Sequence, residues 1–211
     1  MPSTPAQPIK LYRHALSGHC HRVELLLNLL RLPYEPIDID LRAQQQKQSK
    51  FLKLNRFGQV PVIDDAGTII ADSNAILIYL AARYDEGRWL PADPISAAQV
   101  QRWFSVAAGP LATGPAGARR INVFGASLDA EALIVQSHAL LAIINEELAD
   151  RDYLLGQAAT LADITCYSYI AHAPEGNVSL VNYPHVRSWL SRIEHWPRFI
   201  AMQASAAGLA A

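Results

Sequence analysis

Residues 9–41 read IKLYRHALSGHCHRVELLLNLLRLPYEPIDIDL, and this stretch predicts a βαβ unit. Its first five residues alternate in the manner of a strand. The apolar positions that follow recur at the spacing of one helix face and are Val23, Leu26, Leu27 and Leu30. Pro33 ends that helix, and residues 34–41 return to a period near two, which predicts a second strand. We therefore expect two strands joined by a right-handed helical crossover.

The next forty residues or so complete a mixed α/β pattern. A polar stretch leads into a short helix that we expect to end near Leu54. Residues 60–63 and 68–71 are short apolar runs joined by Asp64–Gly67, whose side chains suit a turn, so they predict a β-hairpin. Residues 73–84 again carry one apolar helix face. The order β-α-β-α-β-β-α predicts a mixed four-stranded sheet with helices on both sides.

Beyond residue 94 the sequence predicts helices alone. The expected helices cover 95–108, 129–150, 162–173, 184–194 and 198–206, and Gly109-Pro and Gly114-Pro break the first helical region into pieces. This change of pattern marks a domain boundary. We predict an α/β domain over residues 1–85, a linker over 86–94 with glycine and prolines, and an all-helical domain over 95–211.

Composition excludes several classes of protein. Of 211 residues, 51% are hydrophobic and 18% charged, which supports a large core and excludes a disordered chain. A formal net charge of −1 argues against nucleic acid or an acidic membrane surface as the main partner. The N-terminal residues show no signal-peptide pattern, and the apolar stretch 23–32 is too short to span a bilayer. Two cysteines make no disulfide framework, so we expect a cytoplasmic location.

Pro61 marks the first candidate binding feature. It stands at the start of a predicted strand beside a hairpin, where it removes a hydrogen-bond donor from the sheet. One interpretation is an ordinary edge-strand proline. The other is a cis peptide bond that leaves the amide and carbonyl of Val60 free for a ligand.

Two further candidates lie at helix starts. Asp72 and Ser73 open the helix over 73–84, where Ser73 is a favoured N-cap, the free amides attract a carboxylate, and Asp72 can pair with an ammonium group. Ser17 lies between the first strand and the first helix, where its hydroxyl can donate to a bound thiolate. The alternative for each is a plain helix cap.

Cysteine and histidine residues near Ser17 offer other chemistry. Ser17–Cys20 has the spacing of a thioredoxin C-x-x-C motif without its first cysteine, which predicts a buried and inert Cys20. His14, His19 and His21 lack a further ligand with metal-site spacing, so we interpret them as surface or pocket-rim residues and expect no metal.

Together these segments resemble the soluble glutathione transferases. The N-terminal motifs are Leu-Tyr-x4-Ser-Gly-x-Cys-x2-Val at 11–23, Phe-Leu-x-Leu-Asn-x2-Gly-Gln-Val-Pro at 51–61 and Asp-Ser-Asn-Ala-Ile at 72–76. The C-terminal motifs are Arg-Asp-Tyr-Leu-Leu-Gly at 151–156, Thr-Leu-Ala-Asp-Ile at 160–164, Ala-Pro-Glu-Gly at 173–176 and Tyr-Pro-x-Val-x2-Trp-Leu at 183–190. They look like bacterial members of the serine-type branch, and the resemblance covers nearly the whole chain.

The resemblance implies a thioredoxin-like N-terminal domain with a specific site. Ser17 would be the catalytic residue, and the glutathione-binding residues would be Gln46, Lys47, Gln59, Val60, Pro61, Asp72 and Ser73. Pro61 would be the cis-proline, and Val60 would pair its backbone with the cysteinyl part of glutathione. Asp72 replaces the glutamate usual in the family, and Gln46 stands where relatives often carry histidine. Thr160–Asp163 would be the N-capping motif of the helical domain.

The expected activity is conjugation of glutathione, as co-substrate, to a small electrophile, and the resemblance also implies a homodimer. Two alternatives stay open. One is a glutathione-dependent disulfide reductase or peroxidase on the same fold. The other is a non-catalytic binding protein, against which the joint presence of Ser17, Val60-Pro61 and Asp72-Ser73 argues. The second substrate is not identified by the sequence, because its pocket comes from variable helices and loops.

Overall fold

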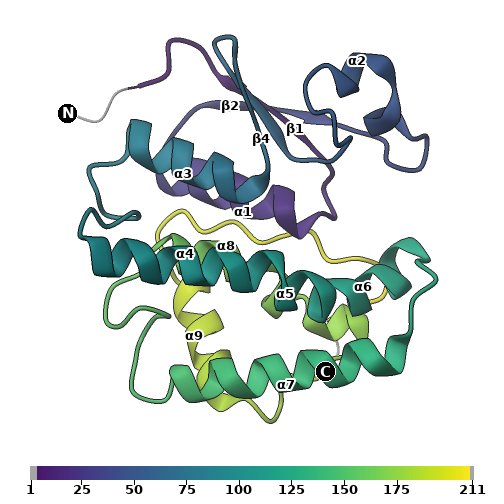
Figure 1. The fold of residues 1–211 in the computed structure, drawn as a ribbon, viewed down its shortest axis with the longest axis vertical. Helices are drawn as coiled ribbons and strands as arrows, with labels where there is room; N and C mark the ends of the chain where they lie inside the picture. The colour runs from purple at the N-terminus through teal and green to yellow at the C-terminus, as the bar shows by residue number, and fades with distance from the viewer. Residues whose placement is uncertain (1–3, 210–211) are drawn as a thin grey trace. The chain divides into compact units, whose positions relative to one another are not determined.

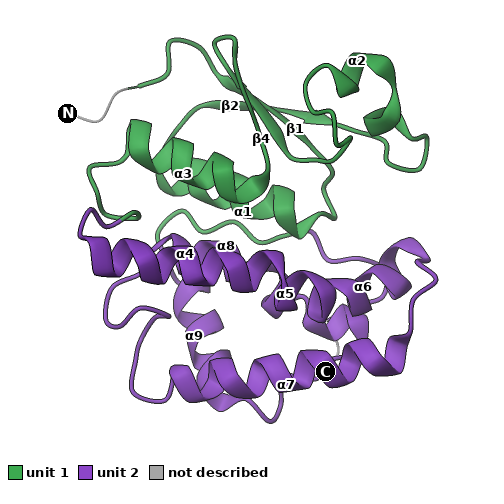
Figure 2. Cartoon of the chain, in the orientation of Figure 1, with its two compact units in different colours: residues 1–90, 197–202 green, residues 91–196, 203–211 purple. Residues whose placement is uncertain are grey.

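The computed structural model describes residues 4–209 and divides the chain into two compact units (Figure 2). Unit 1 comprises the chain up to Leu90 together with Pro197–Met202. Unit 2 comprises Pro91–Trp196 together with the chain from Gln203 onward. The segment after residue 196 is therefore shared between the two units.

Unit 1 has the α/β pattern predicted from the sequence (Figure 1). Its elements are β1 (Ile9–Arg13), α1 (Gly18–Leu29), β2 (Tyr34–Asp38), the 3-10 turn η1 (Gln45–Lys47), α2 (Ser49–Leu52), β3 (Val62–Asp65), β4 (Thr68–Ala71) and α3 (Ser73–Tyr84). The strand β2 is shorter than predicted because the chain turns at Asp40. The Oδ1 atom of Asp40 accepts hydrogen bonds from the amides of Arg42 and Ala43.

The four strands form one mixed sheet in the order β2-β1-β3-β4. Strand β1 runs parallel to β2 and antiparallel to β3, and β3 and β4 form the hairpin. In this register Tyr12 lies opposite Val62, and Val62 lies opposite Ala71. The chain that leaves β1, the chain that enters β3 and the chain that leaves β4 therefore meet at one end of the sheet.

Helices cover both faces of this sheet. On one face Phe51 of α2 packs into a buried cluster with Ile39 and Val62, and the Tyr12 ring meets the Phe51 ring edge-on at 6.3 Å between centroids. On the other face Leu11 is fully buried, and α1 and α3 pack side by side (Figure 1). Because side chains alternate along a strand, neighbouring residues of β1 serve the two cores. The predicted thioredoxin-like architecture is confirmed.

In the described part of unit 2 the regular elements are helices, apart from an isolated β-bridge between Tyr153 and Gly156. Its elements are α4 (Pro94–Ala108), α5 (Pro110–Thr113), α6 (Pro115–Phe124), α7 (Ala130–Glu147), α8 (Leu161–Ala171), the 3-10 turn η2 (Ala173–Gly176) and α9 (Pro184–Glu194). Gly109 and Gly114 each precede a proline at the first helical position, which breaks the helical region as predicted. No helix within residues 4–209 has both the length and the apolar character needed to cross a membrane.

Helix α8 forms the centre of unit 2, with every residue from Leu161 to Ile170 buried. Its first turn has the predicted capping box between Thr160 and Asp163. Asp163 also accepts hydrogen bonds from the Leu154 amide and from the Trp189 indole, both at 2.9 Å. One buried carboxylate thus joins the start of α8 to the preceding loop and to α9.

The predicted helix over residues 198–206 is wrong. That segment is irregular, and Arg198 has a φ of 70°. Two tertiary contacts hold its backbone: the Ile200 carbonyl lies 2.9 Å from Nε2 of His21, and the Ser205 amide donates to Glu175. A short helix is marginal by itself, so these long-range contacts outweigh its alanine-rich propensity.

Candidate functional site

The end of the sheet where β1 and β4 finish and β3 begins collects three of the predicted site segments. Ser17 follows β1, Val60 and Pro61 precede β3, and Asp72 follows β4. The strand pairing alone sets this arrangement, because Tyr12, Val62 and Ala71 are neighbours across the sheet. All of the predicted site residues belong to unit 1.

Ser17 is the N-cap of α1. Its backbone is extended, with φ −90° and ψ 117°, and its Oγ accepts a hydrogen bond from the Cys20 amide at 3.4 Å. A hydroxyl can accept one hydrogen bond and donate another, so capping does not consume the donor of Ser17. The helix N-terminus adds positive potential at the same point. The arrangement is suited to stabilising an anion such as a thiolate.

Cys20 is fully buried, as predicted from its spacing to Ser17. Its sulfur accepts a hydrogen bond from the His14 amide at 3.4 Å. Burial raises the pKa of the Cys20 thiol to about 12, and this outweighs the opposing effects of the Ser17 hydroxyl and the His14 amide. The Cys20 thiol is therefore protonated at neutral pH and is a poor nucleophile.

The Val60–Pro61 peptide bond is cis, as predicted. Val60 precedes β3 and takes no part in the strand pairing, and no hydrogen bond to its main chain is found among residues 4–209. The neighbouring Gln59 has an exposed side chain, while its carbonyl accepts from Asn55 Nδ2 at 2.9 Å. The main chain at Val60 thus has the donor and acceptor that an extended peptide requires.

Gln46 and Lys47 lie in η1 and have different surroundings. The side chain of Gln46 is buried, and its Oε1 has no hydrogen-bond partner within the described chain. Lys47 is exposed, and its Nζ donates to the Phe57 carbonyl at 3.0 Å. A Cβ at Gly58 would lie 2.7 Å from the Gln46 carbonyl, which is backbone and cannot move aside, and 2.9 Å from the Lys47 Nζ. Gly58, with a φ of 59°, is therefore required by both conformation and space.

The sequence-based assignment of Ser73 as the N-cap of α3 is wrong, because Asp72 is the cap. Asp72 has a φ of 75°, and its Oδ1 accepts hydrogen bonds at 3.0 Å from the amides of Asn74 and Ala75. Ser73 is instead the first helical residue, and its side chain is buried. A carboxylate can serve two amides at once, which explains why the acid caps the helix.

The hydroxyl of Ser73 faces α1, a helix in which the sequence predicted no site residue. Arg22 is fully buried and donates from Nη1 to Ser73 Oγ at 3.2 Å and to Asn74 Oδ1 at 3.1 Å. Nδ1 of His19 also lies 3.2 Å from Ser73 Oγ. Arg22 adjoins Val23 on the buried side of α1, and a charged residue beside an apolar helix face is the signal in the sequence that points to it.

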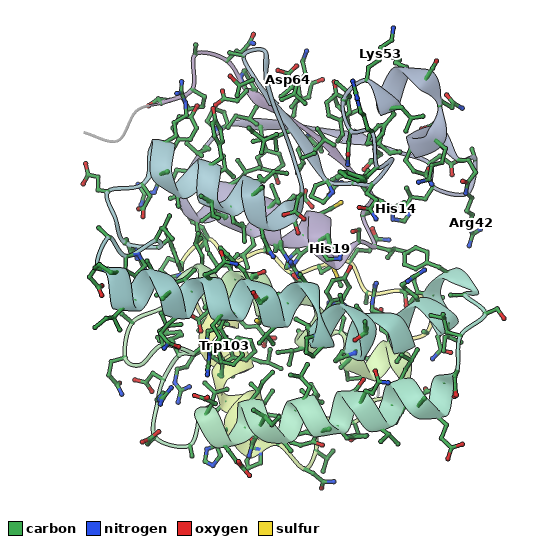
Figure 3. The ribbon with its side chains drawn as sticks, viewed as in Figure 1. His14, His19, Arg42, Lys53, Asp64 and Trp103 are labelled. Carbon is green, nitrogen blue, oxygen red and sulfur yellow. The ribbon has the colours of Figure 1, made fainter. Side chains whose placement is uncertain are left out.

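The three histidines near Ser17 make different contacts. His14 uses Nδ1 to accept from the Leu16 amide, and His21 contacts Ile200. His19 lies in the first turn of α1, and Figure 3 labels it with His14 at the same end of that helix. Burial and the positive charge of Arg22 lower the pKa of His19 to about 3, so its ring is neutral. No group of three or more His, Cys, Asp or Glu side chains suited to a metal occurs in the part of the chain that the structure describes.

Both halves of the chain match models of known protein families. Residues 7–82 match the family model described as glutathione S-transferase, N-terminal domain. Residues 125–197 match the model described as glutathione S-transferase, C-terminal domain. The matched ranges contain every predicted site residue.

Individual proteins show the same similarity over most of the chain. Glutathione S-transferase 3 of Zea mays is 32% identical over 205 residues, which cover 91% of each protein. The crystal structure of a glutathione S-transferase from Pseudomonas fluorescens has a TM-score of 0.89 and 31% identity, and the match covers 94% of this chain and 100% of that one. A glutathione transferase homologue from Drosophila mojavensis, solved with bound glutathione, has a TM-score of 0.82 and 26% identity over 90% of this chain and 89% of its own.

Proposed function

This chain belongs to the glutathione transferase family, and on that premise we propose that it conjugates glutathione to a small hydrophobic electrophile. The observation that carries the proposal is that Ser17, at the N-terminus of α1, lies at the same end of the sheet as Val60, whose main chain makes no hydrogen bond found within residues 4–209. In the reaction the glutathione sulfur attacks an electrophilic carbon and forms a carbon–sulfur bond. A leaving group departs with its electron pair, or in an addition the substrate takes up a proton.

Ser17 activates glutathione by stabilising its thiolate. A free thiol has a pKa of about 8.5, so only a few per cent is ionised at neutral pH. The hydroxyl of Ser17 donates to the sulfur, and the amides at the start of α1 add positive potential. One charge-assisted hydrogen bond of about 1.5–3 kcal/mol corresponds to a pKa depression of about one to two units.

The remaining site residues hold the three parts of glutathione. The Val60 amide and carbonyl pair with the cysteinyl backbone as a neighbouring strand would, next to Pro61. Gln46, Lys47 and Gln59 lie at the glycyl end, and the buried Oε1 of Gln46 supports this because it has no partner within residues 4–209. Asp72 and Ser73 hold the γ-glutamyl end, with the ammonium group on the exposed carboxylate of Asp72.

The wider assignments follow from the family. Residues 1–85 form the glutathione-binding domain, 86–94 form the linker, and the helical residues 95–211 supply contacts to the electrophile. We propose a cytoplasmic homodimer that acts in detoxification. The similarity to the maize glutathione S-transferase over 91% of this chain, and to the Pseudomonas fluorescens structure over 94% of it, supports the family membership from which these assignments follow.

The test removes the hydroxyl of Ser17 in two ways. In Ser17→Ala the pKa of bound glutathione, read from the ultraviolet absorbance of the thiolate, should rise by about one to two units and conjugation should slow about ten- to a hundredfold. Glutathione affinity should change much less. Ser17→Gly is the matched variant, because glycine preserves most of the capping and still removes the donor. An unchanged bound-thiol pKa in both variants would refute the role of Ser17.

Activity assays decide the type of second substrate. A panel of electrophiles, disulfides and hydroperoxides is incubated with the parent protein and glutathione, and the products are identified by mass spectrometry. Conjugates with the electrophiles are expected. Turnover restricted to disulfides or hydroperoxides would support the redox alternative. Absence of turnover, with glutathione bound, would support a binding protein.

A further inference from the structure

The loop between α2 and β3 is tied together by one side chain, that of Asn55. Asn55 is buried, its Oδ1 accepts from the Phe57 amide at 3.0 Å, and its Nδ2 donates to the Gln59 carbonyl at 2.9 Å. Its main-chain carbonyl also accepts from the Gly58 amide at 2.9 Å. One residue therefore makes three hydrogen bonds within the next four residues of the chain.

The partners of the Asn55 side chain fix the orientation of its amide group. A main-chain N–H can only donate and a main-chain carbonyl can only accept. A flipped amide group would set donor against donor at Phe57 and acceptor against acceptor at Gln59, so a single orientation makes both bonds. Asn55 is itself anchored, because its own amide donates to the carbonyl of the buried Phe51 at 3.0 Å. The loop is thus held to the core of unit 1.

A second contact holds the same loop from η1. Nζ of Lys47 donates to the Phe57 carbonyl at 3.0 Å, so the main chain at Phe57 is held at both its amide and its carbonyl. The next residues differ in this respect. Neither the amide nor the carbonyl of Val60 has a hydrogen-bond partner among residues 4–209. The contacts therefore stop just before the main-chain groups that the proposed function assigns to glutathione.

The hydrogen bond to Gln59 bears on Val60 because the two residues share a peptide unit. The Gln59 carbonyl and the Val60 amide belong to one planar group, and in a trans peptide these two dipoles point in opposite directions. Holding the Gln59 oxygen against Asn55 Nδ2 fixes the plane of this group and directs the Val60 N–H away from Asn55. The Val60 side chain packs against the buried cluster around Phe51, which holds the residue at a second point.

We propose that Asn55 is a positioning residue for glutathione, which orients the Val60 amide toward the carbonyl oxygen of the cysteinyl residue. The inference rests on the proposed function, in which Val60 pairs with the cysteinyl backbone. Asn55 acts through the Gln59–Val60 peptide unit and does not contact the ligand. Because the donor is oriented before binding, less of the binding free energy is spent on ordering the loop.

The first test compares glutathione with an analogue in which an E-alkene replaces the cysteinyl–glycyl peptide group. The analogue keeps the thiol, the ammonium group and both carboxylates, but it lacks the carbonyl oxygen that the Val60 amide needs as its acceptor. Calorimetric titration of the parent should show a preference for glutathione of about five- to a hundredfold, because a donor is left without its partner in the complex with the analogue.

Asn55→Asp should remove most of this preference by weakening glutathione more than the analogue. The variant keeps the acceptor for the Phe57 amide and replaces the donor by an oxygen that repels the Gln59 carbonyl. Its added negative charge acts on both anionic peptides alike and therefore cancels in the ratio of their affinities. Gln48→Glu is the matched control, because it makes the same change of charge at an exposed side chain that caps no helix. It should keep the full preference.

A measurement on the parent keeps the inference testable if Asn55→Asp does not fold. The order parameter of the Val60 amide, from nitrogen-15 relaxation without glutathione, should equal those of β3, at the value of about 0.85 that is typical of rigid backbone. A lower value than in β3 that rises when glutathione binds would show that the ligand orders the loop. That result would overturn the inference.

The outcomes of the titrations separate the two hypotheses. If the parent does not bind glutathione, or binds the analogue equally well, the proposed pairing at Val60 is wrong and this inference fails with it. If the parent discriminates and Asn55→Asp keeps the full preference, only the role of Asn55 is overturned. An equal loss of affinity for both peptides, larger than in Gln48→Glu, would show a structural role and would also overturn it. Loss of the preference in Asn55→Asp, with the preference of Gln48→Glu unchanged, supports the inference.

Discussion

Removing the carboxylate of Asp163 should be among the most destabilising single substitutions in unit 2. This side chain is fully buried and accepts from the Leu154 amide at 2.9 Å, the Thr160 amide at 2.8 Å and the Trp189 indole at 2.9 Å. An unsatisfied buried donor costs about 1–3 kcal/mol, so three of them cost about 3–9 kcal/mol in Asp163→Ala. Because a domain has a total stability of about 5–15 kcal/mol, this loss is sufficient to unfold it.

A milder substitution, Asp163→Asn, should give a loss of stability small enough to be measured. In Asp163→Asn the Oδ1 atom retains the bonds from Leu154 and Trp189, while the amide group faces the Thr160 amide, donor against donor. The expected loss is about 1–3 kcal/mol for that one bond. Asp129→Ala is the matched control, because Asp129 is an exposed N-cap with a single bond to the Ala132 amide and should cost about 1 kcal/mol.

Urea unfolding followed by far-ultraviolet circular dichroism measures these losses as shifts in the midpoint. The expected order of stability is parent, then Asp129→Ala, then Asp163→Asn, with Asp163→Ala poorly folded. If Asp163→Ala were no less stable than Asp129→Ala, the buried carboxylate would not connect α8 to α9 in the way described, and the reasoning would be refuted.

Three further predictions concern other buried positions. Gly176→Ala should destabilise unit 2 and lower its melting temperature, because a Cβ there would lie 2.6 Å from the Arg119 amide, which is backbone and cannot rotate away. Glu175→Gln should lower the stability at neutral pH. Burial by itself raises the pKa of the Glu175 carboxyl, but the hydrogen bonds and charge from the Ser205 amide and Arg119 outweigh burial, so the net shift of the pKa is downward. A carboxyl group whose pKa is lowered by folding stabilises the fold at pH values above its ordinary pKa of about 4.3, and this stabilisation is lost as the pH falls. The urea midpoints of the parent and Glu175→Gln should therefore converge in acid. Cys20→Ala should leave conjugation nearly unchanged in a standard electrophile assay, whereas abolished disulfide reduction would support the redox alternative.

Local signals in the sequence determine most of the fold. The alternation in 9–13 and the helical spacing that begins at Gly18 each act within a few residues, and the observed β1 and α1 match them. The predicted stop at Pro33 is less exact, because α1 already ends at Leu29 and Arg31 has a φ of 59°. The same holds for the capping box at Thr160 and Asp163, because its two hydrogen bonds are made within one helical turn. Such features require no knowledge of what packs against them.

The sequence predicted which residues form the candidate site, but not which of them contact one another. Ser17 and Pro61 stand out by their position next to predicted elements, and the register of β1 with β3 then brings their segments together. The exchange of roles between Asp72 and Ser73 was not predictable, because either residue type is a favoured cap. What decides it is the φ of 75° at Asp72 and the acceptor that Ser73 presents to Arg22.

Only the tertiary structure decides features whose partners are distant in sequence. Arg22 and Ser73 are 51 positions apart, and no periodicity around either of them indicates the contact. The segment after Pro197 has helical composition, yet it stays irregular because His21 and Glu175 hold its backbone. In both cases a polar group that is buried by folding must find a partner from another part of the chain, and that requirement outweighs the local preference.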